Sequence, residues 1–248
     1  MSALGELPPV DYAIHADTTW ERAETYKFAA QWTPWLEDHD VNVVTVKAPN
    51  TNLIRHYSSE AKGNYKGVPI PAFTLGRQNK RGQVRRQCTT DWKIKPIRRF
   101  LQKVRGKQTV DQWLGISVDE IERAGLSQVK YVRHVYPLLD LGMTRADCAD
   151  WLTRNNLPIP PKSACVFCPF HNRRAWAEQK RAGGSDWEIS LIVDQQIRDA
   201  RPPNDLFIHP DRVPLAEAVD IPEDHGMFQP SWFEPTDDRE CNSAHCFL

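Results

Sequence analysis

Three cysteines have a spacing that suits a soft metal ion. Cys165 and Cys168 are separated by two residues and followed by Pro169, and Cys88 lies far upstream. Two thiolates at this spacing can face one ion across a tight turn, as they do in zinc knuckles and iron-sulfur sites. Thiol redox pairs use the same spacing. The pair alone therefore indicates an iron-sulfur site, structural zinc or a redox site.

The surroundings of Cys88 favour its thiolate form. Four cations lie close to it in the sequence: Arg85, Arg86, Lys93 and Lys95. Neighbouring cations lower the pKa of a thiol and make it a better metal ligand. We therefore expect Cys88, Cys165 and Cys168 to meet at one metal centre, although Cys88 is distant from the other two in the sequence.

A fourth ligand is not defined by this pattern. Cys241 or Cys246 near the C-terminus could supply it, as could His171, and three ligands with an open metal position are the alternative. Thiolates suit iron and zinc alike, so the metal stays open between an iron-sulfur cluster and zinc. Cys148 lies inside a predicted helix, where we expect a small core residue.

Composition predicts a folded, cytoplasmic protein. The 248 residues are 40% hydrophobic, with 9 Trp and 9 Phe, which is enough to build a core. No stretch approaches the ~20 apolar residues that span a bilayer, and residues 1–9 lack the features of a secretory signal. We therefore expect no membrane association. Because the cytoplasm is reducing, we expect the 6 cysteines to be metal ligands, reactive thiols or core residues and not disulfides.

The charges balance to zero but are unevenly distributed. Between Arg77 and Lys107 twelve Lys and Arg residues face a single acid, Asp91, whereas residues 217–240 are strongly acidic. A basic segment of this kind indicates an anionic partner: an adenine nucleotide, a nucleic acid such as tRNA or DNA, or the acidic tail itself. A merely solvated face is the alternative for its first half.

The pattern of apolar residues predicts an α/β fold with a parallel sheet flanked by helices. Strands at 11–15 and 41–46 enclose a helix at 20–38, with a kink or stop at Pro34, and such a βαβ unit implies parallel pairing. Further on we expect a helix from Pro96, a strand at 109–116 and capped helices at 117–125 and 144–153. Residues 157–161 are extended because of their prolines, and two more helices follow, the first capped by Asn172 and the second at 185–200. We place a first domain at 1–156 and a cysteine-containing helical region with an acidic tail at 157–248.

The order of these motifs resembles the phosphoadenosine phosphosulfate (PAPS) reductase family. The shared features are Cys88-x4-Lys93-Ile-x-Pro96, then Tyr136-Pro-Leu-Leu-Asp140 before the helix starting at Thr144, then Cys165-x2-Cys168. That family has the adenine nucleotide alpha-hydrolase-like fold of the PP-loop superfamily. Its iron-sulfur branch holds a four-iron cluster between a cysteine site and a downstream Cys-x2-Cys, and relatives thiolate tRNA or DNA.

The resemblance implies nucleotide-dependent sulfur chemistry, either as a sulfurtransferase using ATP or as a reductase of activated sulfate in a phosphoadenosine nucleotide. Cys88, Cys165 and Cys168 would hold the cluster. Asp17 and Thr18, which resemble the family's Asp-Thr-Gly segment, would border the nucleotide, and Gly115 would lie near the adenosine. The cations Arg86, Lys93 and Lys95 would neutralise phosphate or cluster charge. No general base is identified.

Two departures from the family pattern leave other functions open. No Ser/Gly-rich phosphate-binding loop follows a first strand, and Gly115 is not followed by the family's arginine. Gly5 and the prolines after it suggest that the sequence starts inside a helix. We therefore expect an incomplete fold in which an absent strand separates the 11–15 strand from the 109–116 strand. An inactive truncated enzyme, or a non-catalytic metal-knuckle protein that binds nucleic acid, are the alternatives.

Overall fold

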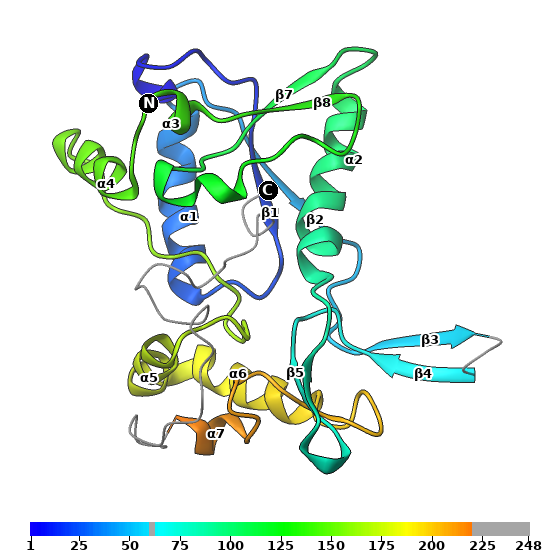
Figure 1. Ribbon diagram of the computed structural model, residues 1–248. Coiled ribbons are helices and arrows are strands. Elements are labelled where there is room, and N and C mark those ends of the chain that lie inside the picture. Colours follow the sequence, from blue (N-terminus) through cyan, green and yellow to red (C-terminus); the bar gives the residue numbers. More distant parts are fainter. Residues whose placement is uncertain (60–62, 220–248) are drawn as a thin grey trace.

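The computed structural model describes residues 1–59 and 63–219, which form a mixed α/β fold with small sheets and several helices (Figure 1). The strands are β1 (Ala13–Asp17), β2 (Val43–Lys47), β3 (Arg55–Ser59), β4 (Gly63–Gly67), β5 (Phe73–Leu75), β6 (Arg81–Gln83), β7 (Val110–Trp113), β8 (Val132–Val135) and β9 (Asp205–Phe207). The α-helices are α1 (Ala23–Glu37), α2 (Lys95–Val104), α3 (Pro137–Asp140), α4 (Arg145–Arg154), α5 (Arg173–Ala182), α6 (Gly184–Gln196) and α7 (Leu215–Ala218). Shorter turns are η1 (Ser2–Leu4), η2 (Arg77–Asn79), the π-helical η3 (Thr89–Ile94) and η4 (Val118–Arg123).

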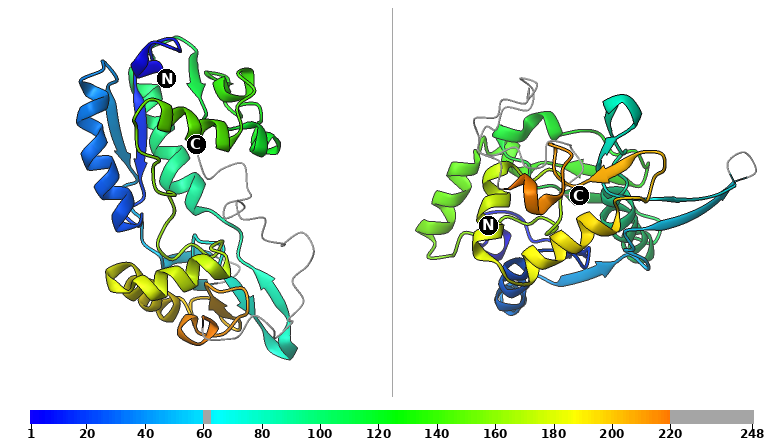
Figure 2. Two further views of the ribbon diagram at one scale, coloured as in Figure 1. Left: turned by 90° about the vertical axis from the view of Figure 1, so that its left-hand side faces the viewer. Right: turned by 90° about the horizontal axis from the view of Figure 1, so that it is seen from below.

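The molecule has two lobes, and segments from the middle of the sequence connect them. Helices α1 and α2 flank β1 and β2 in one lobe, which also contains β7, β8 and α4 (Figure 1). The other lobe contains α5, α6 and α7 together with β5, and the β3–β4 hairpin projects away from both (Figure 2). No helix in the described part of the chain is long and apolar enough to cross a membrane.

The predicted βαβ unit is confirmed. β1 pairs with β2 in parallel, with Ala13 opposite Val43 and Asp17 opposite Lys47, and α1 connects them. The first strand lies two residues later than the sequence pattern suggested. Helix α1 continues through Pro34 to Glu37 instead of ending there. A proline removes one internal hydrogen bond from a helix because it has no N–H. Pro34 lies within one turn of the helix end, so the rest of α1 keeps its hydrogen bonds.

Helix α2 supports two separate parallel sheets. Its buried residues Ile97 and Leu101 pack against Ile14 of β1, Val46 of β2 and Val132 of β8. β7 pairs in parallel with β8, and in the described residues neither strand pairs with β1 or β2. The expected separation between the first strand and the strand after α2 is thus present, as two two-stranded sheets over one helix.

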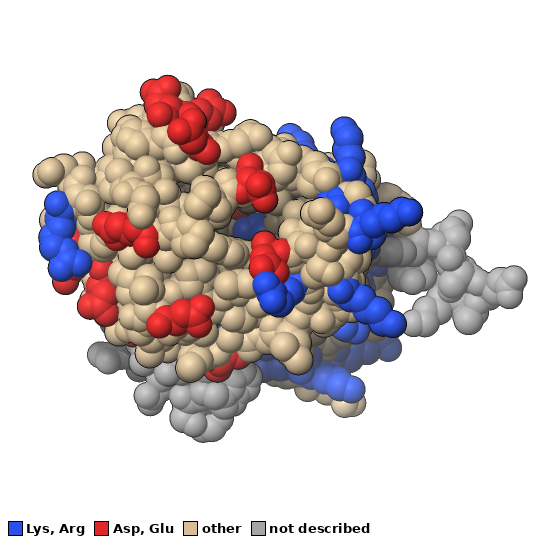
Figure 3. Space-filling model, turned by 90° about the horizontal axis from the view of Figure 1, so that it is seen from above, with Lys and Arg blue, Asp and Glu red and all other residues tan. Residues whose placement is uncertain are grey.

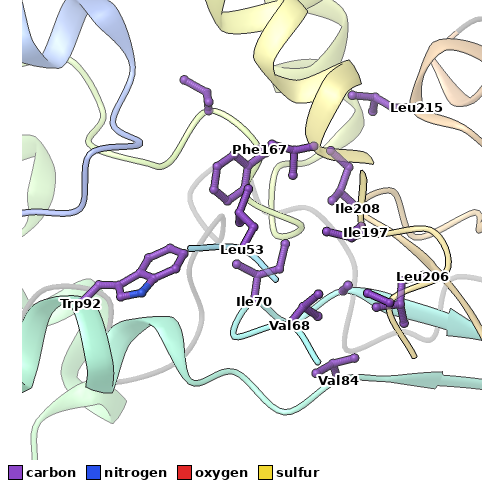
Figure 4. Packing of buried hydrophobic residues seen from close by; sticks show 14 of the residues in the cluster. Leu53, Val68, Ile70, Val84, Trp92, Phe167, Ile197, Leu206, Ile208 and Leu215 are labelled. Atoms are coloured by element: carbon purple, nitrogen blue, oxygen red, sulfur yellow. The ribbon is translucent and has the colours of Figure 1, made fainter. Parts of the chain in front are cut away.

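The largest hydrophobic cluster joins the middle of the chain to the C-terminal helices. Leu53, Val68 and Ile70 contact Phe167, Ile197 and other apolar residues of the second lobe (Figure 4). Burial of this apolar surface provides the main driving force for folding of this lobe. The cluster therefore contains residues from both sides of the predicted boundary at 156/157.

The helix starts follow local capping chemistry in two of three cases. Thr144 and Asp147 form the expected capping box of α4, and the Asn172 side chain caps α5. The segment after Ser117 is instead a 3-10 turn ending at Arg123, because the Ser117 hydroxyl donates to the Asp119 carboxylate and does not cap the backbone. The last long helix covers Gly184–Gln196, shorter than the predicted 185–200.

A buried histidine makes the stability of the second lobe dependent on pH. His209 is 1% exposed, and burial lowers its pKa from 6.5 to about 4, partly opposed by Asp211. The unfolded chain therefore binds a proton at a higher pH than the folded chain does. The stabilisation is complete above pH 6.5 and is lost as the pH falls towards 4.

We therefore expect the free energy of unfolding to drop by the order of 3 kcal/mol across this range. Urea titrations of the wild type and of His209→Gln at several pH values would measure it. The variant lacks the titrating imidazole and should show a shallower acid dependence. Equal slopes in both proteins would contradict this assignment.

Candidate functional site

The three predicted metal-ligating cysteines line one cavity. The cavity has a volume of about 500 Å³, and Cys88, Cys165 and Cys168 all contribute to its wall. Cys88 immediately precedes η3, whereas Cys165 and Cys168 follow the extended segment 157–164. Residues some eighty positions apart in the sequence thus line one cavity, and their meeting at one metal centre stays a prediction.

The Cys165–Cys168 segment forms a tight turn held by backbone hydrogen bonds. The Cys168 amide donates to the Cys165 carbonyl at 3.0 Å, and the His171 amide donates to the Cys168 carbonyl at 3.0 Å. The Val166 amide donates to the Trp20 carbonyl at 2.8 Å, and an isolated bridge pairs Glu21 with Cys165. The turn is therefore fastened to the loop that follows β1.

Burial raises the pKa of all three thiols. It raises the pKa of Cys168 to about 12, with a further increase from the Cys88 thiol, while the Phe170 amide and Arg86 act in the opposite direction. Burial and then Glu21 raise the pKa of Cys165 well above its usual value. The pKa of Cys88 is raised by burial and lowered in part by Arg86. The thiols are therefore protonated at neutral pH unless a cation binds them.

Two cations lie beside these thiols. Burial lowers the pKa of Arg86, and the thiols of Cys88 and Cys168 oppose that shift. The Arg86 guanidinium also lies over the Phe170 ring, 5.7 Å from its centroid. For Lys93, burial alone would lower the pKa, but Glu21, Cys165 and Cys168 raise it above its ordinary value. Both cations would therefore stabilise thiolates in this cavity.

A buried carboxylate links the loop after β1 to the cysteine turn. Glu21 is 5% exposed, and its Oε1 lies 3.5 Å from Lys93 Nζ. Its Oε1 also accepts from the Thr18 hydroxyl at 3.3 Å, and its Oε2 accepts from the Ser163 hydroxyl at 2.9 Å. The Thr18 oxygen lies 3.5 Å from Cys165 Sγ. This network fixes the position of Cys165 relative to Lys93.

The remaining predicted site residues lie elsewhere. The Asp17 carboxylate accepts from the Thr19 amide and the Tyr26 hydroxyl and pairs with Lys47 at 3.3 Å, so it stabilises the local turn and does not line the cavity. Lys95 is exposed and pairs with Asp91. Gly115 is not in the cavity wall, and a side chain there would meet Leu138 only at 4.0 Å. Cys241 and Cys246 lie outside the described residues.

Sequence reasoning missed two residues of this site and misplaced a third. Glu21 and Ser163 carry no motif, because their role depends on the pairing between the loop after β1 and the cysteine turn. Cys148, expected in the core, is half-buried in α4 and lines the cavity. Its pKa is raised by burial and then by Asp147 and Asp119.

His171 is the remaining candidate ligand beside the turn. Burial lowers its pKa to about 3, and its Nδ1 has no hydrogen-bond partner among residues 1–59 and 63–219. Its ring packs against Trp176 with centroids 4.7 Å apart. A neutral imidazole with a free ring nitrogen fits metal coordination as well as core packing.

The donor chemistry fits a thiophilic metal, but the side chains are not preassembled. Three thiols and a neutral imidazole are donors that suit iron or zinc, and the two cations would offset the charge of the thiolates. Within residues 1–59 and 63–219, however, no three His, Cys, Asp or Glu side chains are close enough together to hold an ion as they stand. Comparisons with protein-family models, curated proteins and solved structures find no match.

Proposed function

We propose that this chain binds an iron-sulfur cluster or zinc through Cys88, Cys165 and Cys168, and that it works in nucleotide-dependent sulfur chemistry like the PAPS reductase family. The observation that carries the proposal is the meeting of these three cysteines at one cavity with Arg86 and Lys93 beside them. Metal binding at these thiols would release their protons, because thiolates and not thiols are the metal ligands.

The chain's own residues have distinct parts in this proposal. The three thiols bind the metal, and Arg86 and Lys93 offset the negative charge that three thiolates bring into a buried site. Glu21 holds Lys93 in place and, through Thr18, orients Cys165. A bound cluster would supply a sulfur-binding iron or a one-electron carrier.

The nucleotide part of the proposal depends on a different set of residues. It depends on the resemblance and on the positive groups that border the cavity, which include Arg145 and Lys162 besides Arg86 and Lys93. Those groups suit a phosphate or sulfate. Thr18 lies in the cavity wall, whereas Asp17 and Gly115 do not. Calorimetric titration with ATP and with phosphoadenosine phosphosulfate would test this part separately from the metal.

Anaerobic purification followed by iron, zinc and acid-labile sulfide analysis tests the metal proposal directly. Iron with an equal amount of sulfide, together with visible charge-transfer absorption, would identify a cluster. Zinc without sulfide would identify a structural site. Metal-free protein that also fails to bind added iron or zinc would refute the proposal and leave a thiol redox site or simple core cysteines.

A nucleic-acid-binding metal-knuckle protein is the second candidate, and one surface feature favours it. Seen from above, Lys and Arg gather on the side of the molecule where α2 lies, while Asp and Glu are spread over the opposite side (Figure 3). Arg99 and Lys103 of α2, and Lys107 shortly after it, are exposed. Lys93 does not belong to this face, because it lies at the cysteine cavity and pairs with Glu21.

We therefore expect the combined variant Arg99→Glu, Lys103→Glu and Lys107→Glu to weaken binding of tRNA or duplex DNA roughly tenfold or more, with a smaller dependence of affinity on salt. The control reverses three exposed cations away from α2: Lys27, Arg154 and Arg181. Fluorescence anisotropy at several salt concentrations measures both effects. Equal losses of affinity in the two variants would indicate only a general charge effect. Unchanged affinity in both would mean that the basic face is only solvated and does not bind nucleic acid.

A further inference from the structure

The β3–β4 hairpin extends beyond the body of the protein as a two-stranded antiparallel arm (Figure 1, Figure 2). Its five residue pairs run from Arg55 opposite Gly67 to Ser59 opposite Gly63, so the paired part is roughly 17 Å long. Among the described residues each of the two strands pairs only with the other. The arm therefore reaches outward and belongs to no larger sheet in this part of the chain.

The base of the arm is anchored in the core and to helix α2. Leu53, which precedes β3, and Val68, which follows β4, are buried in the largest hydrophobic cluster. The Asp91 carboxylate accepts from Arg55 of β3 through one oxygen and from Lys95 of α2 through the other, the latter at 2.6 Å. Asp91, the single acid of the basic segment, thus holds the start of the arm beside the first residue of α2.

A row of exposed cations runs from this anchor along α2. Lys95, Arg99 and Lys103 are all exposed and lie four residues apart, so they share one face of the helix at intervals of about 6 Å. The arm leaves the body on the side where α2 lies, which is also the side where Lys and Arg gather (Figure 1, Figure 3). On the arm itself, His56 and Lys66 are exposed and lie opposite one another. A projecting arm and a basic helix face are thus joined on one side of the molecule.

We propose that the arm enters the major groove of duplex DNA while the cations along α2 bind the phosphates beside that groove. The major groove of B-form DNA is about 12 Å wide and about 8.5 Å deep and admits a two-stranded ribbon, and the arm is longer than this depth. Lysine and arginine rows suit the phosphate backbone, which carries the opposite charge. The major groove of duplex RNA is too narrow for such a ribbon. This role of the arm rests on the second candidate function, nucleic-acid binding, and names duplex DNA as the partner.

A variant with a shortened arm tests this role without changing the charge of the protein. Replacing residues 57–65 by Asn-Gly closes the hairpin with a two-residue turn and keeps Arg55 at the base. The removed segment contains one acid, Glu60, and one base, Lys62, so the net charge stays the same. The comparison is the triple charge reversal on and after α2 described above, which keeps the arm.

Three measurements are made on the wild type and on both variants. Fluorescence anisotropy gives the affinity for duplex DNA and for duplex RNA of the same sequence. Protection of guanine N7 from dimethyl sulfate reports whether the major groove of the DNA is occupied, because N7 lies in that groove. Thermal unfolding confirms that the shortened variant is folded.

We expect the shortened arm to weaken binding of duplex DNA by about tenfold or more and to abolish the N7 protection, while affinity for duplex RNA changes by less than about twofold. The triple charge reversal should weaken binding of both duplexes, because it removes phosphate contacts. Wild-type DNA affinity and N7 protection in the shortened variant would overturn the role of the arm and leave nucleic-acid binding through α2 in place. Equal losses for DNA and RNA would overturn it as well, since the arm would then not be reading the major groove. A wild-type protein that binds neither duplex would refute nucleic-acid binding and the role of the arm together.

Discussion

Replacing Cys165 or Cys168 by serine is expected to weaken metal binding roughly a hundredfold or more, the largest functional effect that we predict. A serine hydroxyl is a poor ligand for a thiophilic metal and stays protonated at neutral pH. Cys88→Ser should have the same effect, because Cys88 lines the same cavity and its thiol raises the pKa of Cys168. Metal and sulfide content of each purified variant, with circular dichroism to confirm folding, measures the effect.

Cys148→Ser is the matched control for these variants. Cys148 lines the same cavity from α4, outside the Cys165–Cys168 turn and the segment around Cys88, so this variant should retain wild-type metal content. Loss of metal in Cys148→Ser as well as in Cys165→Ser would contradict the three-ligand proposal. Full retention in all four variants would exclude a cysteine-ligated centre at this cavity.

Local patterns predicted the parts of the fold that depend on neighbouring residues. The β1–α1–β2 unit follows from β-branched runs around an amphipathic segment, and the α4 capping box follows from Thr144 and Asp147. The predicted ends of helices were less accurate where tertiary contacts determine them. The segment after Ser117 has the letters of a capped helix, yet the Ser117 hydroxyl binds Asp119, and the turn closes as a 3-10 helix.

The candidate site was predicted only as far as its cysteines. Spacing indicated Cys165 and Cys168, and the family order added Cys88, which the structure places in the same cavity wall. Glu21 could not be predicted, because its importance comes from a bridge to Cys165 and from burial beside Lys93. Asp17 resembles a nucleotide-binding residue in the sequence. In the structure its carboxylate accepts hydrogen bonds from Tyr26 and Thr19 and pairs with Lys47.

Replacing the buried Asp194 by alanine is expected to cause a large loss of stability. Asp194 is 3% exposed in α6, and its carboxylate accepts from the Ile208 amide at 3.0 Å and the Leu215 amide at 3.1 Å. It also pairs with Arg198 one turn later. One side chain thus fastens α6 to the residue that follows β9 and to the first residue of α7.

The Asp194→Ala variant leaves two buried amides and one partly buried guanidinium without this acceptor, which should lower the free energy of unfolding by about 3 kcal/mol. Asp194→Asn should lose less, since its amide oxygen can still accept from one backbone N–H. The control Glu188→Ala removes an exposed carboxylate from the same helix and should change stability by less than about 0.5 kcal/mol. Urea unfolding followed by tryptophan fluorescence gives these values. If Asp194→Ala and Glu188→Ala were equally stable, the carboxylate would not be holding these segments together.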